Sequence, residues 1–421
     1  MTPEALAVPS LEAVPERAGG LRYMARQPIL DVRGQVHAYE LLFRDGLENS
    51  FRGTDLELAS RTIVDNIVIF GLQELSGGLP AFVNCTEELL TGDLAAALPP
   101  QTTVLEILET VEPTAELLAA CRKFKAQGFR IALDDFIWDP KFAQLVELAD
   151  YIKVDFLGSH AAERQEVLRN IHGTRAKLVA EKVETVDEFS KARSEGFTLF
   201  QGYYFCRPIM LEKRKIPANR LHHLEILQLL HADPMDFRRL VPLVKNDASL
   251  THRLLRLVNS AGYGVRQEIR SIQSALVIVG EDTFRRIATL AIASELNTGQ
   301  PAEILRMALI RGRFCELAAS LGKLCTSEQY LVGLLSLFPA MLQVPMEQLT
   351  PMFPLRPQIR ESLNGAANQD RLLLAWIEAH ERGDWRASDA IAQAAGLDSE
   401  QLYACYAEAV PWAWAALRSA N

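Results

Sequence analysis

Polar residues that can bind a metal ion or a phosphate follow almost every short apolar run in the first half of the sequence. The runs include AFVN at 81–84, VLEIL at 104–108 and RIALDD at 130–135. If these runs are the strands of an α/β barrel, their carboxyl ends open onto one face, where residues roughly 20 to 40 positions apart converge. We therefore predict a single site at the strand ends. Its candidate residues are Glu40, Asn84, Glu106, Asp134, Asp135, Lys153, Glu181 and Gln201.

The chemistry expected of such a site follows from its carboxylates. Burying several carboxylates together is costly unless cations neutralise them. Ligands that are all oxygen favour Mg²⁺ or Mn²⁺ over zinc. Any one of these residues could instead cap a helix or form an ion pair, but their regular placement at successive strand ends favours a shared site.

Glu40 illustrates the geometry that we expect. In a strand, Glu40, Leu42 and Arg44 share one face, so that a carboxylate and a guanidinium lie near each other. This pair suits a metal ion beside a phosphate, which Arg can grip with two hydrogen bonds. Asp134 and Asp135 can both face the site only if the strand ends there and the backbone turns.

The elements that must position these residues are strands that alternate with helices. Two runs, RYMARQPIL and QVHAYELLF, predict a hairpin that turns at 32–34. After the hairpin, apolar runs alternate with helix-like segments such as 114–125 and 186–194, which indicates a parallel sheet that is buried on both faces. We predict that the sheet closes into an α/β barrel.

The second half reads as all-α, because apolar residues recur there at helical spacing. Helix starts are predicted at Asp247 and Ser274, and a helix end at Asn259-Ser260. The tail beyond Gly365 is helical and carries Trp residues that we expect to pack rather than bind a ligand. We predict three regions: a disordered tail at 1–20, a barrel domain at 21–212, and a helical domain with a C-terminal extension at 213–421.

The composition of the chain argues against several classes of protein, among them nucleic-acid-wrapping, secreted and membrane-spanning proteins. The 421-residue chain has a net charge of −9, which argues against wrapping nucleic acid. Its six cysteines form no CxxC pair and indicate free thiols in a reducing compartment. The start of the chain does not resemble a signal peptide. The longest apolar stretch, at 331–342, is too short for a membrane span. We expect a cytoplasmic protein with no membrane partner.

Residues 21–208 resemble the EAL domain family. The matching pieces are RQPILD (26–31), YELLFR (39–44), FVN (82–84), LEILE (105–109), LDDF (133–136), IKVD (152–155), AEKVET (180–185) and QGYYFCRP (201–208). The resemblance implies a TIM-like (β/α) barrel that binds cyclic di-GMP and, when active, opens it to linear pGpG with two Mg²⁺ or Mn²⁺ ions.

The resemblance also implies roles for individual residues. The resemblance implies catalytic roles for Glu181, Lys153 and Gln201, with Glu181 next to the metal ions and the attacking water. Gln27, Leu42 and Arg44 would contact the nucleotide. The metal ligands would be Glu40, Asn84, Glu106, Asp134 and Asp135.

This chain departs from the EAL pattern next to the metal ligands. The family's loop after the paired aspartates is rich in glycine, whereas this chain reads DDFIWDPKF. Glu109, which resembles the glutamate that holds that loop, is retained, and Lys182 stands where glycine is usual. Changes around metal ligands commonly weaken a site. The altered loop therefore favours binding over turnover, and the sequence does not predict the oligomeric state.

Residues 219–351 resemble the HDOD domain, a helical module related to HD phosphohydrolases but without their metal ligands. KNDASLTHRLLRLVNSA at 245–261 is the most specific segment, and the chain contains no His-Asp dipeptide. We expect His222 and His223 to be surface or linker residues. The arginines of this region could form a docking face for an anion or be solvated; they are Arg253, Arg256, Arg285 and Arg286.

These observations favour a signalling protein whose barrel senses cyclic di-GMP and whose helical domain relays the state to a protein partner. The alternative is an active, metal-dependent cyclic di-GMP phosphodiesterase that is regulated by the helical domain. A third hypothesis is an interaction scaffold in which both domains are degenerate.

Overall fold

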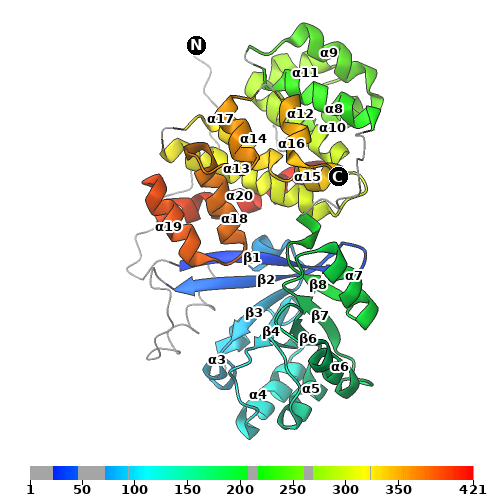
Figure 1. Cartoon of the computed structure of the whole chain (residues 1–421), viewed down its shortest axis with the longest axis vertical. Helices are drawn as coiled ribbons and strands as arrows, with labels where there is room; N and C mark the ends of the chain where they lie inside the picture. The colour runs from blue at the N-terminus through cyan, green and yellow to red at the C-terminus, as the bar shows by residue number, and fades with distance from the viewer. Residues whose placement is uncertain are drawn as a thin grey trace.

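The computed structural model describes residues 22–45, 72–92, 94–206, 217–232, 234–259, 269–322, 324–353 and 355–420. Figure 1 shows strands in the lower part of the molecule and helices stacked above them. The predicted disordered tail at 1–20 and the region around the predicted boundary at 212 lie outside the described residues, so both stay predictions.

Eight strands form a closed barrel in the order β1 to β8, which confirms the predicted α/β barrel. Strand β1 pairs antiparallel with β2 and with β8, and the remaining neighbours pair in parallel. Gly34, at a φ of 74°, lies in the turn between β1 and β2, as the predicted hairpin requires. The strands are β1 (Arg22–Asp31), β2 (Val36–Asp45), β3 (Ala81–Cys85), β4 (Thr103–Ile107), β5 (Arg130–Leu133), β6 (Tyr151–Asp155), β7 (Lys177–Glu181) and β8 (Leu199–Gln201).

Helices between the strands begin at residues with good capping side chains. The Thr114 hydroxyl accepts a hydrogen bond from the Leu117 amide at the start of α4, and Thr185 and Glu188 form a capping box at the start of α7. The helices of this part are α2 (Leu72–Ser76), α3 (Glu87–Thr91), α4 (Ala115–Ala126), α5 (Ala143–Leu148), α6 (Ala161–Asn170) and α7 (Val186–Glu195), with short 3₁₀ turns at Leu94–Ala97, Pro140–Phe142 and Tyr204–Cys206.

The barrel interior is layered, and this layering positions the site. One layer is apolar and includes one residue from each strand: Ile29, Ala38, Phe82, Val104, Ala132, Tyr151, Val179 and Leu199. Residues two positions apart in a strand point to the same side. The next inward position toward the open end is therefore Glu40 after Ala38, Glu106 after Val104, and so on around the barrel. The apolar layer therefore lies directly beneath the polar layer and closes the bottom of the site.

Helices make up the second part of the molecule, as predicted. They are α8 (Ala218–Leu230), α9 (Phe237–Asn246), α10 (Ala248–Val258), α11 (Ile272–Val279), α12 (Glu281–Leu296), α13 (Ala302–Leu321), α14 (Thr326–Leu335), α15 (Phe338–Leu342), α16 (Met346–Leu349), α17 (Pro357–Leu363), α18 (Leu372–Glu381), α19 (Trp385–Ala395) and α20 (Ser399–Ala420), with 3₁₀ turns at Thr350–Met352 and Gln369–Arg371.

Two of the predicted helix boundaries are confirmed and one is wrong. Asp247 caps α10 by accepting a hydrogen bond from the Leu250 amide, and α10 ends at Asn259 as expected. The predicted start at Ser274 is three residues late, because the hydroxyl of Ser271 accepts a hydrogen bond from the Ser274 amide and caps α11.

The prediction for His223 is also wrong. This side chain is buried, and its Nε2 lies 2.7 Å from a carboxylate oxygen of Asp247, so it joins α8 to the start of α10. Most of the arginines considered for an anion-docking face are in ion pairs instead: Arg253 with Glu295, Arg285 with Glu281 and Arg286 with Glu316.

The two parts pack against each other through the outer face of the hairpin. Tyr39 of β2 donates a hydrogen bond from its hydroxyl to Glu303 of α13 at 2.7 Å. The Arg306 guanidinium lies 3.8 Å from the centre of the Trp414 ring, and the Trp414 ring packs against Tyr39 at 6.4 Å. The Trp residues of the tail thus pack, as predicted, and Trp414 packs against the barrel.

Among the residues that the structure describes, no helix has the length and hydrophobicity that crossing a membrane requires.

Candidate functional site

Lys153 stands at the centre of the polar layer, buried and surrounded by carboxylates. Its ammonium group lies 3.2 Å from Glu40, 2.9 Å from Asp134 and 2.8 Å from Glu181, and it also forms an ion pair with Glu106. These residues come from five different strands or strand ends, and the barrel brings them together as the sequence predicted. One ammonium group faces four carboxylates, so the cluster keeps an excess of negative charge.

Amide side chains complete the layer on the side of the hairpin. The Gln201 amide nitrogen donates hydrogen bonds to Glu40 at 2.5 Å and to the side-chain oxygen of Gln27 at 2.9 Å. Asn84 donates a long hydrogen bond of 3.5 Å to the other oxygen of Glu40. Gln201 therefore fixes the orientation of the Glu40 carboxylate and links it to strand β1.

The two aspartates after β5 both reach the site because the backbone turns between them. Asp135 adopts a φ of 39°, in the left-handed region that Asp tolerates better than most residues. This is the turn that the sequence required if both carboxylates were to face the same space. Oxygens of Asp134, Asp135 and Glu181 lie within 4.8 Å of one another.

Lys182 places a second cation at the mouth of the site. Its ammonium nitrogen lies 2.6 Å from Asp155 and 3.5 Å from Asp135. The backbone of Lys182 has a φ of 55°, which glycine adopts more easily, in agreement with the departure noted in the sequence. Asp155, the last residue of β6, was not among the predicted site residues, although it ends the IKVD segment.

Burial and charge shift the acidity of the cluster. Burial raises the pKa of Glu181 to about 8, although Lys153 opposes this shift. Burial likewise raises the pKa of Glu106 well above its usual range. Burial disfavours the charged form of Lys153, but the surrounding carboxylates outweigh it and hold the pKa of this lysine well above its ordinary value. Without a further cation, the cluster therefore favours protonation of Glu106 and Glu181 over full ionisation of its carboxylates.

Several oxygens of the site have no hydrogen-bond partner among the described residues. They are side-chain oxygens of Asn84, Glu106, Asp135, Glu181 and Gln201, and all are buried. A buried oxygen without a partner is costly, and a metal ion is one partner that would satisfy it. The donor set, with only carboxylate and amide oxygens, fits divalent cations such as Mg²⁺ or Mn²⁺ and does not fit a thiolate or imidazole zinc site.

A cavity of about 400 Å³ opens above this cluster. Gln27 and Leu42, the residues predicted to contact a nucleotide, line it, and so do Lys182 and Tyr203. Arg382, which follows helix α18, lines it as well, and sequence reasoning missed this residue. The predicted phosphate ligand Arg44 lies in β2, but its side chain is outside the described part of the structure.

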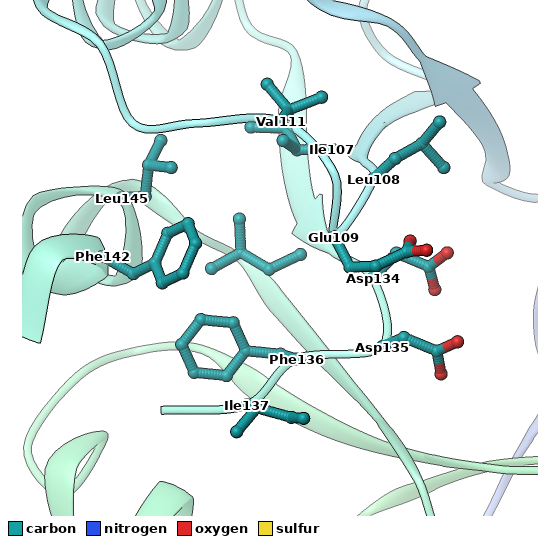
Figure 2. Close-up of a pocket in the computed structure, with 11 residues that line it drawn as sticks. Ile107, Leu108, Glu109, Val111, Asp134, Asp135, Phe136, Ile137, Phe142 and Leu145 are labelled. Atoms are coloured by element: carbon teal, nitrogen blue, oxygen red, sulfur yellow. The ribbon is translucent and has the colours of Figure 1, made fainter. Parts of the chain in front are cut away.

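The loop that departs from the EAL pattern encloses a separate apolar hollow of about 250 Å³. Figure 2 shows Phe136, Ile137 and Phe142 around this hollow, whereas the carboxylates of Asp134 and Asp135 point away from it. Glu109 is exposed and forms no ion pair with any described residue. The loop thus supports the aspartates by apolar packing, and Glu109 does not hold it.

Comparisons with known proteins agree with both parts of the chain. A model of the EAL domain family matches residues 80–208, and a model of the HDOD domain family matches residues 216–342. The EAL match begins downstream of the hairpin that carries Glu40, so it covers less than the resemblance noted in the sequence at 21–208. Among solved structures, Klebsiella pneumoniae BlrP1 in its complex with calcium and cyclic di-GMP is 23% identical with a TM-score of 0.37; the match covers 43% of this chain and 54% of that one.

Two relatives match over nearly the whole length of this chain. The protein named cyclic di-GMP phosphodiesterase CdgJ from Vibrio cholerae is 32% identical over 396 residues, which are 93% of this chain and 92% of the relative. The uncharacterized protein YuxH from Bacillus subtilis is 32% identical over 401 residues, 93% of this chain and 97% of the relative. The chain therefore belongs to the family of proteins that join an EAL domain to an HDOD domain.

Proposed function

We propose that this protein binds cyclic di-GMP at the open end of its barrel and that its helical part relays the bound state to a protein partner. The observation that carries the proposal is the buried cluster around Lys153, with its unpartnered oxygens, beneath a cavity lined by Gln27 and Leu42. A cyclic dinucleotide would place its guanine bases against such walls, and metal ions held by the acidic floor would attract its phosphates. The relative CdgJ, named a cyclic di-GMP phosphodiesterase, supports this choice of ligand.

The residues that would hold metal ions are Glu40, Asn84, Glu106, Asp134 and Asp135. Mg²⁺ or Mn²⁺ bound there would neutralise the carboxylates and supply an activated water for phosphodiester hydrolysis. Lys153 holds four of the site's acids in place through its ion pairs, and Gln201 holds the orientation of Glu40. Both residues fix the acids before a ligand arrives, so that little reorganisation is needed on binding.

The second candidate function is turnover of cyclic di-GMP to linear pGpG. The observation in its favour is that every predicted metal ligand is present and reaches the site. The loop DDFIWDPKF and the unpaired Glu109 distinguish this site from the family pattern, and changes around metal ligands commonly reduce activity. We therefore place binding first and hydrolysis second.

A relay role for the helical part follows from what it contains. Within the described ranges, the one group of acidic, His or Cys side chains that could hold a metal ion lies in the barrel, at Asp134, Asp135 and Glu181. The helical part instead contributes ion pairs and apolar packing. A helical module that is packed against a ligand site is suited to passing a change at that site to a partner.

The test is to incubate the full chain with cyclic di-GMP and Mn²⁺ or Mg²⁺ and to measure bound ligand and linear product together. Glu40→Ala removes a carboxylate of the cluster, and Glu116→Ala, exposed on α4, is the matched control. Bound ligand without product, lost in Glu40→Ala only, supports a receptor. Product that disappears only in Glu40→Ala supports the phosphodiesterase. Neither binding nor product in the unmodified protein would overturn both and leave an interaction scaffold.

A further inference from the structure

The ligand cavity has one wall that the barrel does not supply. Arg382 lines it together with residues of the strands, although it lies in the turn between α18 and α19. Figure 1 shows α18 ending beside the barrel, next to β1 and β2. The helical part therefore contributes a charged side chain to the cavity in the same molecule.

Close contacts hold this turn against the hairpin. The Gln27 side-chain nitrogen donates a hydrogen bond of 3.3 Å to the main-chain oxygen of Glu381. Gly383 has a φ of 71°, and a Cβ at this position would lie 2.9 Å from the Leu42 side chain. Gln27 and Leu42 are the two predicted nucleotide contacts whose side chains the structure describes, and both touch this turn.

The turn is also anchored inside the helical part. Glu381 is buried and accepts hydrogen bonds from the Arg311 guanidinium of α13, the shortest at 2.6 Å. Removing one partner of a buried ion pair is strongly destabilising, so this pair fixes the end of α18 relative to α13. Arg311 also donates a hydrogen bond of 3.1 Å to Ser336, just after α14. The cavity wall is thus joined through Glu381 to the core helices.

Arg382 itself is available for a ligand. Its side chain is exposed, and no described carboxylate lies within ion-pair distance of it. By contrast, the two lysines of the site are paired with carboxylates. A guanidinium without a partner, at the rim of a cavity with an acidic floor, offers donors in the geometry that suits a phosphate.

We infer that Arg382 binds a phosphate of the cyclic dinucleotide and that, through the turn at 381–383, the helical part senses whether the site is occupied. This inference rests on the proposed function and adds to it a ligand residue from outside the barrel. When the ligand engages Arg382 and Gln27, it acts on the segment that Glu381 ties to α13. The turn at 381–383 therefore belongs both to the ligand site and to the path by which the helical part would respond to the ligand.

The first test is the affinity of the full-length protein for cyclic di-GMP, measured by calorimetry in the presence of Mn²⁺. Arg382→Ala is expected to weaken binding about tenfold or more, as loss of a charge-assisted hydrogen bond requires. Arg386→Ala, exposed on the first turn of α19, is the matched control and keeps the original affinity. Mn²⁺ affinity without nucleotide is expected to be equal in all three proteins, which shows that the acidic cluster is intact.

The second test is hydrogen exchange over residues 372–390 with and without saturating cyclic di-GMP. The unmodified protein is expected to gain protection there, and Arg382→Ala is expected to lose this gain. If the unmodified protein does not bind cyclic di-GMP, the proposed function itself fails. If it binds but Arg382→Ala binds equally well, or is weakened no more than Arg386→Ala, this inference is overturned while the proposed function stands. Tight binding without protection over 372–390 would likewise overturn the sensing role.

Discussion

The ammonium group of Lys182 lies 2.6 Å from the carboxylate of Asp155, at the mouth of the acidic site. Lys182 adopts a φ of 55°, a conformation that costs a non-glycine residue on the order of 1 kcal/mol. The same ammonium lies 3.5 Å from Asp135, one of the predicted metal ligands. A positive side chain is thus held, at some conformational cost, beside acids that would otherwise attract a metal ion.

Replacing this lysine is expected to strengthen metal binding. In Lys182→Gly, the competing charge is removed and the backbone keeps a conformation that glycine adopts freely. Because Lys182 is half exposed, the charge effect is modest, and we expect Mn²⁺ to bind roughly three- to tenfold more tightly. Calorimetric titration with Mn²⁺ measures this change. Lys182→Gln distinguishes the effect of the charge from the effect of the backbone conformation, since it removes the charge and keeps the unfavourable φ. If neither variant binds Mn²⁺ more tightly, Lys182 does not compete with the metal.

Removing the central lysine is expected to destabilise the protein in the absence of metal. Lys153→Met leaves four buried or half-buried carboxylates without their cation, and breaking a buried pair in this way costs about 3–5 kcal/mol. Thermal unfolding in EDTA should show a large loss of stability. Because Mn²⁺ can replace the lost charge, the variant should gain more stability from Mn²⁺ than the unmodified protein does.

The control for this prediction is Lys125→Met. Lys125 is paired with Asp150 at 2.7 Å, but both side chains are 31% exposed. Such a pair contributes about 0–1 kcal/mol, so its loss should change stability little and should not alter the response to Mn²⁺. Equal losses in Lys153→Met and Lys125→Met would show that the central lysine is not what holds the cluster.

The sequence predicted the barrel and its acidic layer because both follow from local rules. From β2 to β8, a polar residue lies two positions after the residue of the apolar layer, as Glu106 lies after Val104, so the period of a strand puts both in the barrel interior. The turn that lets Asp135 face the site was also expected from the sequence. These features depend on residues that are close in the chain, and short-range patterns are enough to find them.

The contribution of the helical part could not be predicted in this way. Arg382 lies more than 300 positions from Gln27 in the sequence, and the turn that carries it resembles any helix end followed by glycine. His223 was missed for a similar reason, because its partner Asp247 is on another helix. Packing between segments that are far apart in the sequence decides both positions, and the spacing of residues within one segment carries no signal of such packing.

Trp414 is expected to couple the unfolding of the two parts. Its ring packs against Tyr39 of β2 and the Arg306 guanidinium, and a Cβ at Gly77 would lie 2.4 Å from it. Trp414→Ala removes this contact, and calorimetry should then resolve two thermal transitions where the unmodified protein has one. Trp412→Ala, near Arg313 within the helical part, should keep a single transition at lower temperature. A single transition in Trp414→Ala as well would show that other contacts are enough to couple the parts.

Acid is expected to destabilise the protein through His380. This residue is fully buried against Trp376, and burial lowers its pKa to about 3, from an ordinary value near 6.5. Above pH 6.5 the ring is neutral in both the folded and the unfolded chain. As the pH falls below 6.5, the unfolded chain takes up a proton that the folded protein does not, so the free energy of unfolding decreases by about 1.4 kcal/mol per pH unit until about pH 3.

His380→Phe keeps an aromatic ring in this place and removes the titration. Between pH 7.5 and pH 5.0, urea unfolding should show that the unmodified protein loses about 2 kcal/mol more stability than the variant does. His172→Gln, at an exposed position after α6, should behave as the unmodified protein does. Because the carboxylates of the barrel are the same in all three proteins, their contribution cancels in the comparison. Equal losses in His380→Phe and the unmodified protein would mean that His380 is not the group through which acid acts.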